Sequence, residues 1–263
     1  MIDKAAGPGA QIDEQIASLT TKVADLTDRV VALENAEPVE PPIEPPPVKP
    51  PPSGVADIPL SWTDPRFNQT ITPGRATLSK GQTASNKSWQ ENSGEPTVTC
   101  NGNNTLNTCR IKSREAVRIG GSGSFNYENC YFEAQGTGAD HADTIQAYSP
   151  GSRGTLVLRD TCVRAFNQAA TAGLFIADNW TGTIDLEDVV FWGGPYGLRV
   201  HPDTGGDNII RLKNVYFVGP FGYGPYLFSD VAGHRNIFEL WENVCNATIV
   251  NGKLVPGTPI PKP

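Results

Sequence analysis

The sequence contains one line of residues that recurs five times: two alternating apolar residues, then an Asn or Asp, then a further apolar residue. The copies lie at residues 125–132, 156–163, 184–191, 210–217 and, in degenerate form, 239–246. Their Asn or Asp residues are 31, 28, 26 and 29 residues apart. A period of about 20–50 residues is typical of a solenoid, in which each repeat buries its apolar side only against its neighbours.

Each copy also predicts a corner. Side chains along a strand alternate with a period of two residues, and here the apolar parity shifts by one residue at the Asn or Asp. We expect a tight bend at that residue, because Asn and Asp tolerate the left-handed backbone conformation. The predicted bends are at Asn129, Asp160, Asp188, Asn214 and Asn243.

A second set of short strands follows at matching intervals, centred on Val117, Ile145, Leu174, Leu198 and Leu227. Strand, bend, short strand, loop and strand, repeated along the chain, is the pattern of a parallel β-helix. Residues 98–250 resemble the right-handed, pectate-lyase-like β-helix superfamily, whose coils carry the same line. The resemblance implies a mainly β fold with a single-chain, right-handed parallel β-helix. The alternative is an antiparallel sandwich with frequent turns.

Residues 11–36 predict an α-helical coiled coil. Apolar residues are spaced alternately by four and three, which is a heptad seam. The seam consists of Ile12, Ile16, Leu19, Val23, Leu26, Val30 and Leu33. Arg29 at g precedes Glu34 at e by five residues, the offset of an interchain ion pair in a parallel homo-oligomer. β-branched a residues with Leu at d favour a dimer. The alternative is a helix packed on its own globular domain.

The remaining segments complete the predicted domain organisation. Residues 1–10 are expected to be an anchor peptide, and residues 251–263 a C-terminal tail. Residues 37–54 are proline-rich and predict an extended polyproline II linker, because proline fixes φ and removes a hydrogen-bond donor; the alternative is a ligand for a proline-binding domain. Residues 55–97 are expected to cap the open end of the β-helix, since solenoids need atypical terminal units.

Charge and hydropathy exclude several classes of partner. The net charge is −7, and no continuous basic stretch is present, which argues against nucleic acid and anionic membranes as partners. No apolar stretch approaches the length of a membrane span, and the N-terminus lacks the hydrophobic core of a signal peptide. We therefore expect synthesis in a cytoplasm without export by a standard signal.

The five cysteines match no zinc-binding spacing, and no metal or cofactor is expected. Cys130 follows its Asn at an inward position and is interpreted as a core residue. Cys162 and Cys245 take the next position, which predicts that they point outward and are too far apart to bond. Cys100 and Cys109 either close a loop disulfide or remain free.

The short strands predict a ligand-binding row. Aligning them places five outward side chains one above the other, in coils about 4.8 Å apart. The row consists of Arg118, Gln146, Phe175, Arg199 and Phe228. Aromatic faces and planar polar groups are suited to a glycan chain lying along the helix axis. The alternative is that these are unrelated solvent-facing residues.

Candidate catalytic residues follow the same strands. Asp178 and Asp203, with His201, come from adjacent coils, and glycosidases hold two carboxyls about 5 Å or about 6.5–9.5 Å apart. Residues 140–146 also resemble the H-x-D-G-I-Q line of some polysaccharide-active β-helix proteins, with Thr144 in place of the Gly. The alternatives are polar residues common in loops and, for Asp143, a carboxylate that binds backbone amides.

The order of anchor peptide, coiled coil, proline linker and β-helix resembles a bacteriophage fibre or spike. This resemblance implies a virion protein that is assembled in the host cytoplasm, attached to other phage structural proteins through its N-terminus, and trimeric. Its β-helix head would bind host-surface glycan. Two alternatives are an enzyme that cleaves this polysaccharide as a hydrolase or lyase, and a bacterial surface adhesin.

Overall fold

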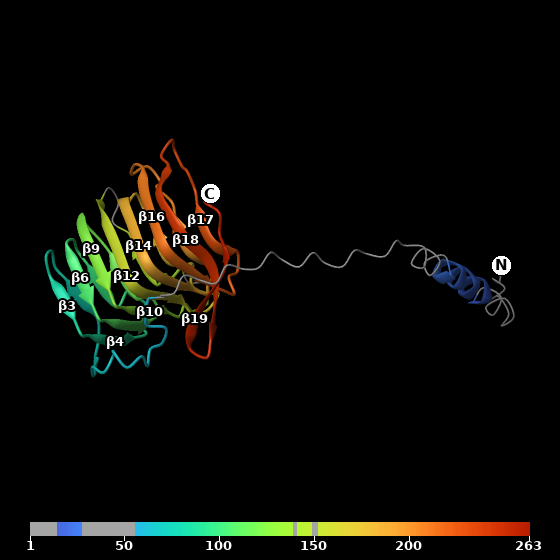
Figure 1. Cartoon of the computed structure of the whole chain (residues 1–263), viewed down its shortest axis with the longest axis horizontal. Coiled ribbons are helices and arrows are strands. Elements are labelled where there is room, and N and C mark those ends of the chain that lie inside the picture. Colours follow the sequence, from blue (N-terminus) through green and yellow to red (C-terminus); the bar gives the residue numbers. More distant parts are fainter. Residues whose placement is uncertain (1–14, 28–55, 139–140, 149–151) are drawn as a thin grey trace, which may run out of the picture. The chain divides into compact units, whose positions relative to one another are not determined.

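The computed structural model describes residues 15–27, 56–138, 141–148 and 152–263 (Figure 1). The chain divides into two units, residues 1–50 and residues 51–263. In the first unit, residues 15–27 form a helix, the only one in the described part of the chain. No helix among the described residues is long and apolar enough to cross a membrane.

The described helix covers only part of the segment predicted as a coiled coil. Four seam residues lie on it, and they are exposed by 57, 61, 61 and 56% in the single chain: Ile16, Leu19, Val23 and Leu26. The other three, Ile12, Val30 and Leu33, lie outside the described residues, as do residues 1–10 and the linker 37–54. A long coiled coil over residues 11–36 is therefore not shown.

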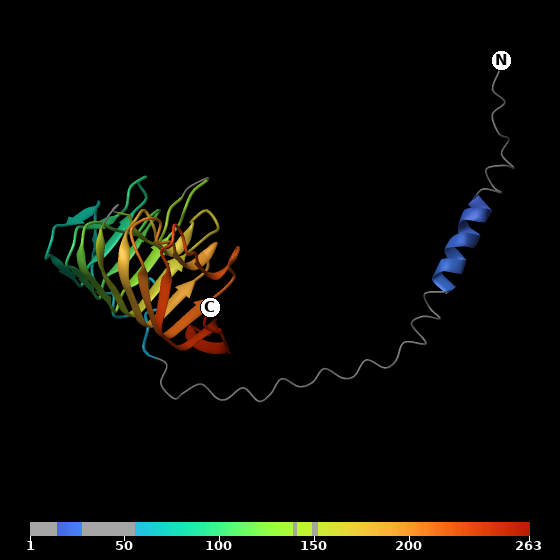
Figure 2. The same ribbon diagram turned by 90° about the horizontal axis from the view of Figure 1, so that it is seen from above.

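The second unit is a parallel β-solenoid of the right-handed type, as the repeated line predicts. Its strands stack coil upon coil (Figures 1 and 2). The seven-stranded sheet contains, in spatial order, β17 (Gly224–Phe228), β15 (Tyr196–Val200), β13 (Ala172–Ile176), β11 (Ile145–Ala147), β8 (Val117–Ile119), β5 (Val98–Cys100) and β2 (Ala76–Leu78).

The 12-stranded sheet bends around the other two sides of the solenoid. Its main path contains β1 (Ile71–Thr72), β4 (Ser88–Glu91), β7 (Arg110–Ser113), β10 (Tyr131–Ala134), β12 (Arg153–Ala165), β14 (Thr181–Trp192), β16 (Asn208–Val218), β18 (Asn236–Val250) and β19 (Lys253–Pro259). Off this path, β3 (Thr83–Ser85) pairs with β6 (Asn104–Asn107), which pairs with β9 (Gly123–Glu128). Among the strands of the described residues, β18 and β19 form the one antiparallel pair, so residues 253–259 of the predicted tail are a strand.

The predicted corners are confirmed. The φ angles are 53, 46, 57, 52 and 50° at Asn129, Asp160, Asp188, Asn214 and Asn243. This left-handed conformation is accessible to Asn and Asp at lower cost than to most residues. Side-chain amides also link successive corners: Nδ2 of Asn214 donates to Oδ1 of Asp188 at 2.9 Å, and Nδ2 of Asn243 donates to Oδ1 of Asn214 at 2.8 Å.

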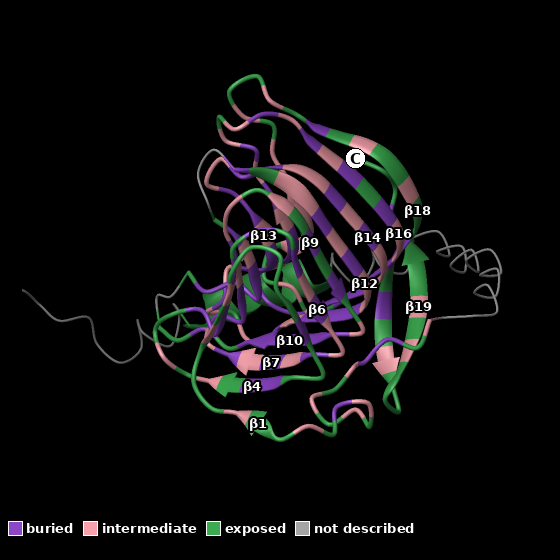
Figure 3. Cartoon of the chain, turned by 90° about the vertical axis from the view of Figure 1, so that its left-hand side faces the viewer, coloured by how far each residue is buried: buried purple, intermediate pink, exposed green. Residues whose placement is uncertain are grey.

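The core consists of apolar side chains stacked at equivalent positions of successive coils, visible as alternating buried and less buried bands in Figure 3. Phe125, Leu156, Ile184 and Ile210 form one such stack. The alignment of Glu239 with this stack is wrong: a register shift after Ile210 brings Phe238 opposite it instead. Glu239 is left outside, where it binds Arg211 at 2.6 Å.

Residues 56–67 form a segment that we call the strap. Its anchors Ile58 and Phe67 are buried in a second apolar cluster on the outer surface of β10, β12, β14, β16 and β18. We call this surface, together with that of β7, the strap face. The strap therefore lies along the side of the solenoid, and not over an open end. The parallel ladders begin at Ile71, within the segment assigned to the cap.

All five cysteines are described, and all are free and buried. Cys130 is a core residue, as predicted. Cys162 and Cys245 point away from the core of the solenoid, as predicted. Neither is exposed, because both are buried in the apolar cluster beneath the strap. Cys100 and Cys109 form no disulfide, and burial raises the pKa of the Cys100 thiol to about 12.

Candidate functional site

Four of the five predicted row residues form a continuous row on the outer surface of the seven-stranded sheet, which we call the row face. Arg118 is in register with Gln146, Gln146 with Phe175, and Phe175 with Arg199. Their neighbours along each strand are buried in the core, whereas these four side chains are partly exposed. The parity of the short strands therefore places this row correctly.

The prediction for Phe228 is wrong. Arg199 is in register with Leu227, and Phe228 lies opposite the buried Val200. The register in β17 differs by one residue from the sequence alignment, because Tyr226 and not Leu227 pairs with Leu198. Phe228 instead joins an aromatic cluster at the end of the core, with its ring centroid 4.8 Å from that of Phe238.

Arg199 is a cation without a hydrogen-bond acceptor among the described residues. Its Cζ lies 4.5 Å from the centroid of the Phe175 ring, so the guanidinium stacks on the aromatic face. Its Nε is buried and unpaired within the described part of the chain. A buried donor without a partner is costly. The rest of the guanidinium is less buried, and its N–H groups can donate to a ligand oxygen.

Arg118 is held more tightly. Its Nε and Nη2 donate to the two carboxylate oxygens of Glu115, each at 2.8 Å, and Nη2 also donates to Oε1 of Gln146 at 3.4 Å. Its Cζ lies 4.8 Å from the ring centroid of Tyr148, which is exposed. Glu115 is not among the predicted site residues, because a spacing of three residues at the start of a strand does not indicate a contact with Arg118.

Asp143, from the H-x-D-like line, lies fully buried at the entrance to β11. Its Oδ1 accepts a hydrogen bond from the amide of Ala172 at 2.8 Å, as the backbone-binding interpretation predicts. Burial raises the pKa of this carboxyl well above its usual value, and the negative charge of Glu115 adds to the effect. Its Oδ2 has no hydrogen-bond partner among the described residues.

The three catalytic candidates lie close together beyond the ends of β13 and β15. Burial raises the pKa of Asp178, and the charge on Asp203 raises it further. Both carboxylate oxygens of Asp203 have partners: Oδ1 lies 2.5 Å from Nδ1 of His201, and Oδ2 accepts from the amide of Asn179 at 3.1 Å. Asp203 therefore fixes the turn and orients the imidazole of His201. Nε2 is then the ring nitrogen of His201 that does not contact Asp203.

The described residues contain no group of three or more His, Cys, Asp or Glu side chains placed to hold a metal ion. Comparison of the chain with protein-family models, curated proteins and solved structures gives no significant match.

Proposed function

We propose that the β-solenoid is the head of a bacteriophage fibre or spike, and that its row face binds host-surface glycan without cleaving it. The observation that supports this most directly is Arg199, whose guanidinium stacks on Phe175 and has no acceptor among the described residues. It is already oriented, so little side-chain entropy is lost when a ligand binds. We also propose that the solenoid is a member of the pectate-lyase-like β-helix superfamily.

The chemistry of the row suits a sugar chain that lies along the coils. Phe175 offers apolar ring surface for contact with the C–H groups of a sugar, and Arg199 offers donors to hydroxyl or carboxylate oxygens. Gln146 lies between this pair and Arg118, which Glu115 fixes in place. None of these contacts requires a group with a shifted pKa.

Binding of purified host-surface polysaccharides by the full chain, measured by calorimetry, tests the proposal. Phe175→Ala should abolish binding, because it removes both the ring and the support of Arg199. Tyr223→Ala is a matched control, since Tyr223 is an aromatic residue exposed by 80% outside the row. Equal binding by Phe175→Ala and the unmodified chain would contradict the proposal.

A polysaccharide-cleaving enzyme is the second candidate, and the His201–Asp203 pair beside Asp178 supports it. An imidazole oriented by a carboxylate and a carboxyl with a raised pKa are suitable groups for general base and acid catalysis. In our preferred proposal, Asp203→Asn leaves glycan binding intact. Release of reducing or unsaturated ends by the unmodified chain, and its loss in Asp203→Asn, would favour the enzyme.

We further propose that the exposed seam of the helix joins copies of the chain into a parallel homo-oligomer. Ile16, Leu19, Val23 and Leu26 are apolar side chains that a single chain leaves exposed to water. The proposal of a virion location and of attachment to phage structural proteins rests on the order of segments in the sequence. Sedimentation of the full chain tests the association, and a monomer would contradict it.

A further inference from the structure

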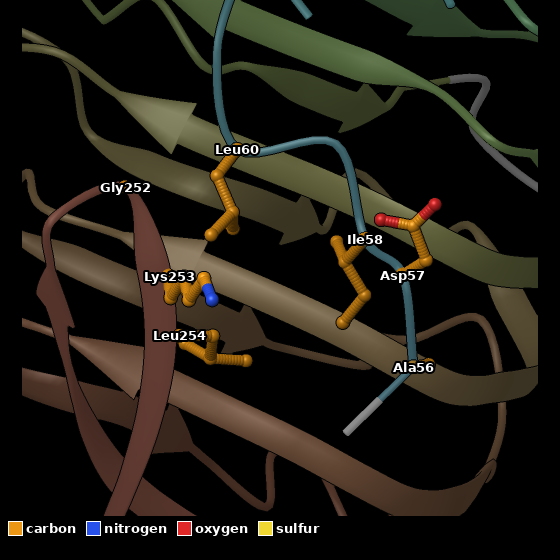
Figure 4. A pocket seen from close by; sticks show the side chains of 7 residues that line it. All are labelled: Ala56, Asp57, Ile58, Leu60, Gly252, Lys253 and Leu254. Atoms are coloured by element: carbon orange, nitrogen blue, oxygen red, sulfur yellow. The ribbon is translucent and has the colours of Figure 1, made fainter. Parts of the chain in front are cut away.

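A second row of polar and aromatic residues lies on the strap face. Lys112 is in register with Glu133, Glu133 with Arg164, and Arg164 with Trp192. They form the floor of a hollow of about 320 Å³, which strap residues 60–62 and the turn at Gly252 complete. A neighbouring hollow of about 290 Å³ lies between Ile58 of the strap and the turn before β19 (Figure 4). The larger hollow is within the size range of small-molecule sites, about 300–1,000 Å³.

A buried carboxylate organises this floor. Glu133 is exposed by only 1%, and the hydroxyl of Tyr131 donates to its Oε2 at 2.5 Å. Nζ of Lys112 forms an ion pair with Oε1 at 2.9 Å, and Nη1 of Arg164 donates to Oε2 at 3.3 Å. Two cations thus surround one carboxylate, and this cluster carries a net charge of +1.

The guanidinium of Arg164 is fixed by two aromatic rings. Its Cζ lies 4.0 Å from the ring centroid of Trp192 and 4.6 Å from that of Phe166. Only Nη1 makes hydrogen bonds, to Glu133 and Tyr131, so Nε and Nη2 have no acceptor in the described part of the chain. These two donors form the edge of the guanidinium that binds an oxyanion in bidentate fashion.

We propose that this hollow binds a sugar residue that carries an oxyanion, either a carboxylate or a sulfate. The free edge of Arg164 and the excess positive charge select the anion, and the partly exposed ring of Phe166 provides an apolar wall for the sugar. Because the site is on the strap face, it is separate from the row of Arg118, Gln146, Phe175 and Arg199 and does not depend on the function proposed for that row.

Three monosaccharides of one ring skeleton test the proposal with the full chain: galacturonic acid, galactose 6-sulfate and galactose, compared by saturation-transfer NMR titration. At least one of the two acids should bind about tenfold or more tightly than galactose. Which acid binds identifies the oxyanion. Absence of binding by both acids, or equal binding of all three sugars, would overturn the proposal.

Two variants locate the binding. Arg164→Lys retains the charge but removes the bidentate edge, and should weaken binding of the acid by about tenfold or more. Phe166→Ala removes the exposed wall and one of the two rings that support Arg164, but leaves both cations and Glu133 in place, so it serves if Arg164→Lys proves unstable. Arg211→Lys is the matched control, since Arg211 pairs with Glu239 before the Asn214 corner and lies outside both the row and the hollow; it should leave the affinity unchanged. Unchanged affinity in Phe166→Ala and in a folded Arg164→Lys would also overturn the proposal.

Discussion

The row face and the strap face are built from the same coils, and each carries a row in which an arginine stacks on an aromatic ring of the adjacent coil. On the row face Arg199 stacks on Phe175, and the outward side chains meet solvent. On the strap face the outward residues Tyr131, Cys162, Val190, Tyr216 and Cys245 are buried beneath the strap. Strand parity thus determines which side chains leave the core, but not which of them reach water.

Two buried carboxyl groups, Glu133 on the strap face and Asp143 near the row face, are held in different ways. Glu133 on the strap face has two cations and a phenol within bonding distance. Asp143, which lies near the row face, accepts one backbone hydrogen bond and has no ion pair within the described part of the chain. A buried charge is tolerated when it is paired, whereas an unpaired acid is more stable in its neutral form.

The largest expected effect is the loss of stability when a Phe is truncated on the strap face. Phe67→Ala should lower the free energy of unfolding by about 3 kcal/mol, because a nearly buried ring leaves a cavity between the strap and the sheet. Phe175→Ala on the row face should cost about 1 kcal/mol, since its ring is already partly hydrated. Chemical denaturation monitored by circular dichroism measures both. Equal losses would remove the distinction between the two faces.

A smaller effect of opposite sign on the two faces is expected when each buried carboxyl is changed to an amide. Glu133→Gln should lower the free energy of unfolding by about 2 kcal/mol at neutral pH, because it leaves the cations without a counter-charge. Asp143→Asn should instead raise stability at neutral pH, because Asn keeps an oxygen for the amide of Ala172 and carries no buried charge.

The pH dependence checks this prediction. The pKa of Asp143 is raised on folding from its ordinary value of 3.8. The contribution of the protonated carboxyl to the free energy of unfolding is therefore fully present below pH 3.8. It is lost as the pH rises through the raised pKa. The gain from Asp143→Asn should therefore be absent below about pH 4 and appear above it. A gain that is constant with pH would show that ionisation of Asp143 is not its cause.

The solenoid and the row could be predicted from the sequence because both depend on local rules. The five corner residues adopt the left-handed conformation, and Arg118 to Arg199 stay in register, because the short strands begin at equivalent positions in successive coils. The sequence alignment places Phe228 on the outer surface, which is wrong because β17 pairs with β15 at a register shifted by one residue from that alignment. Parity alone cannot reveal such a shift.

The strap and its hollow depend on contacts between distant parts of the sequence. Lys112, Glu133, Arg164 and Trp192 could have been aligned by the same parity argument, applied to the strands after each bend. Nothing in that alignment indicates that residues 56–67 lie over the neighbouring positions. The catalytic candidates lie in the loops that follow β13 and β15. These loops differ in length, so the contacts between the candidates could not be derived from their spacing in the sequence.

The path of the strap has a mechanical consequence. Ala56 and Lys253 line the same hollow at the last coil, and the chain then runs back along the side of the solenoid to enter β1 in the first coil. Tension applied at residue 56 therefore acts first on the contacts of the strap with the strap face, before it reaches any ladder of the coils. The strap would detach one anchor at a time, Ile58 before Phe67, while the row face kept its geometry under load.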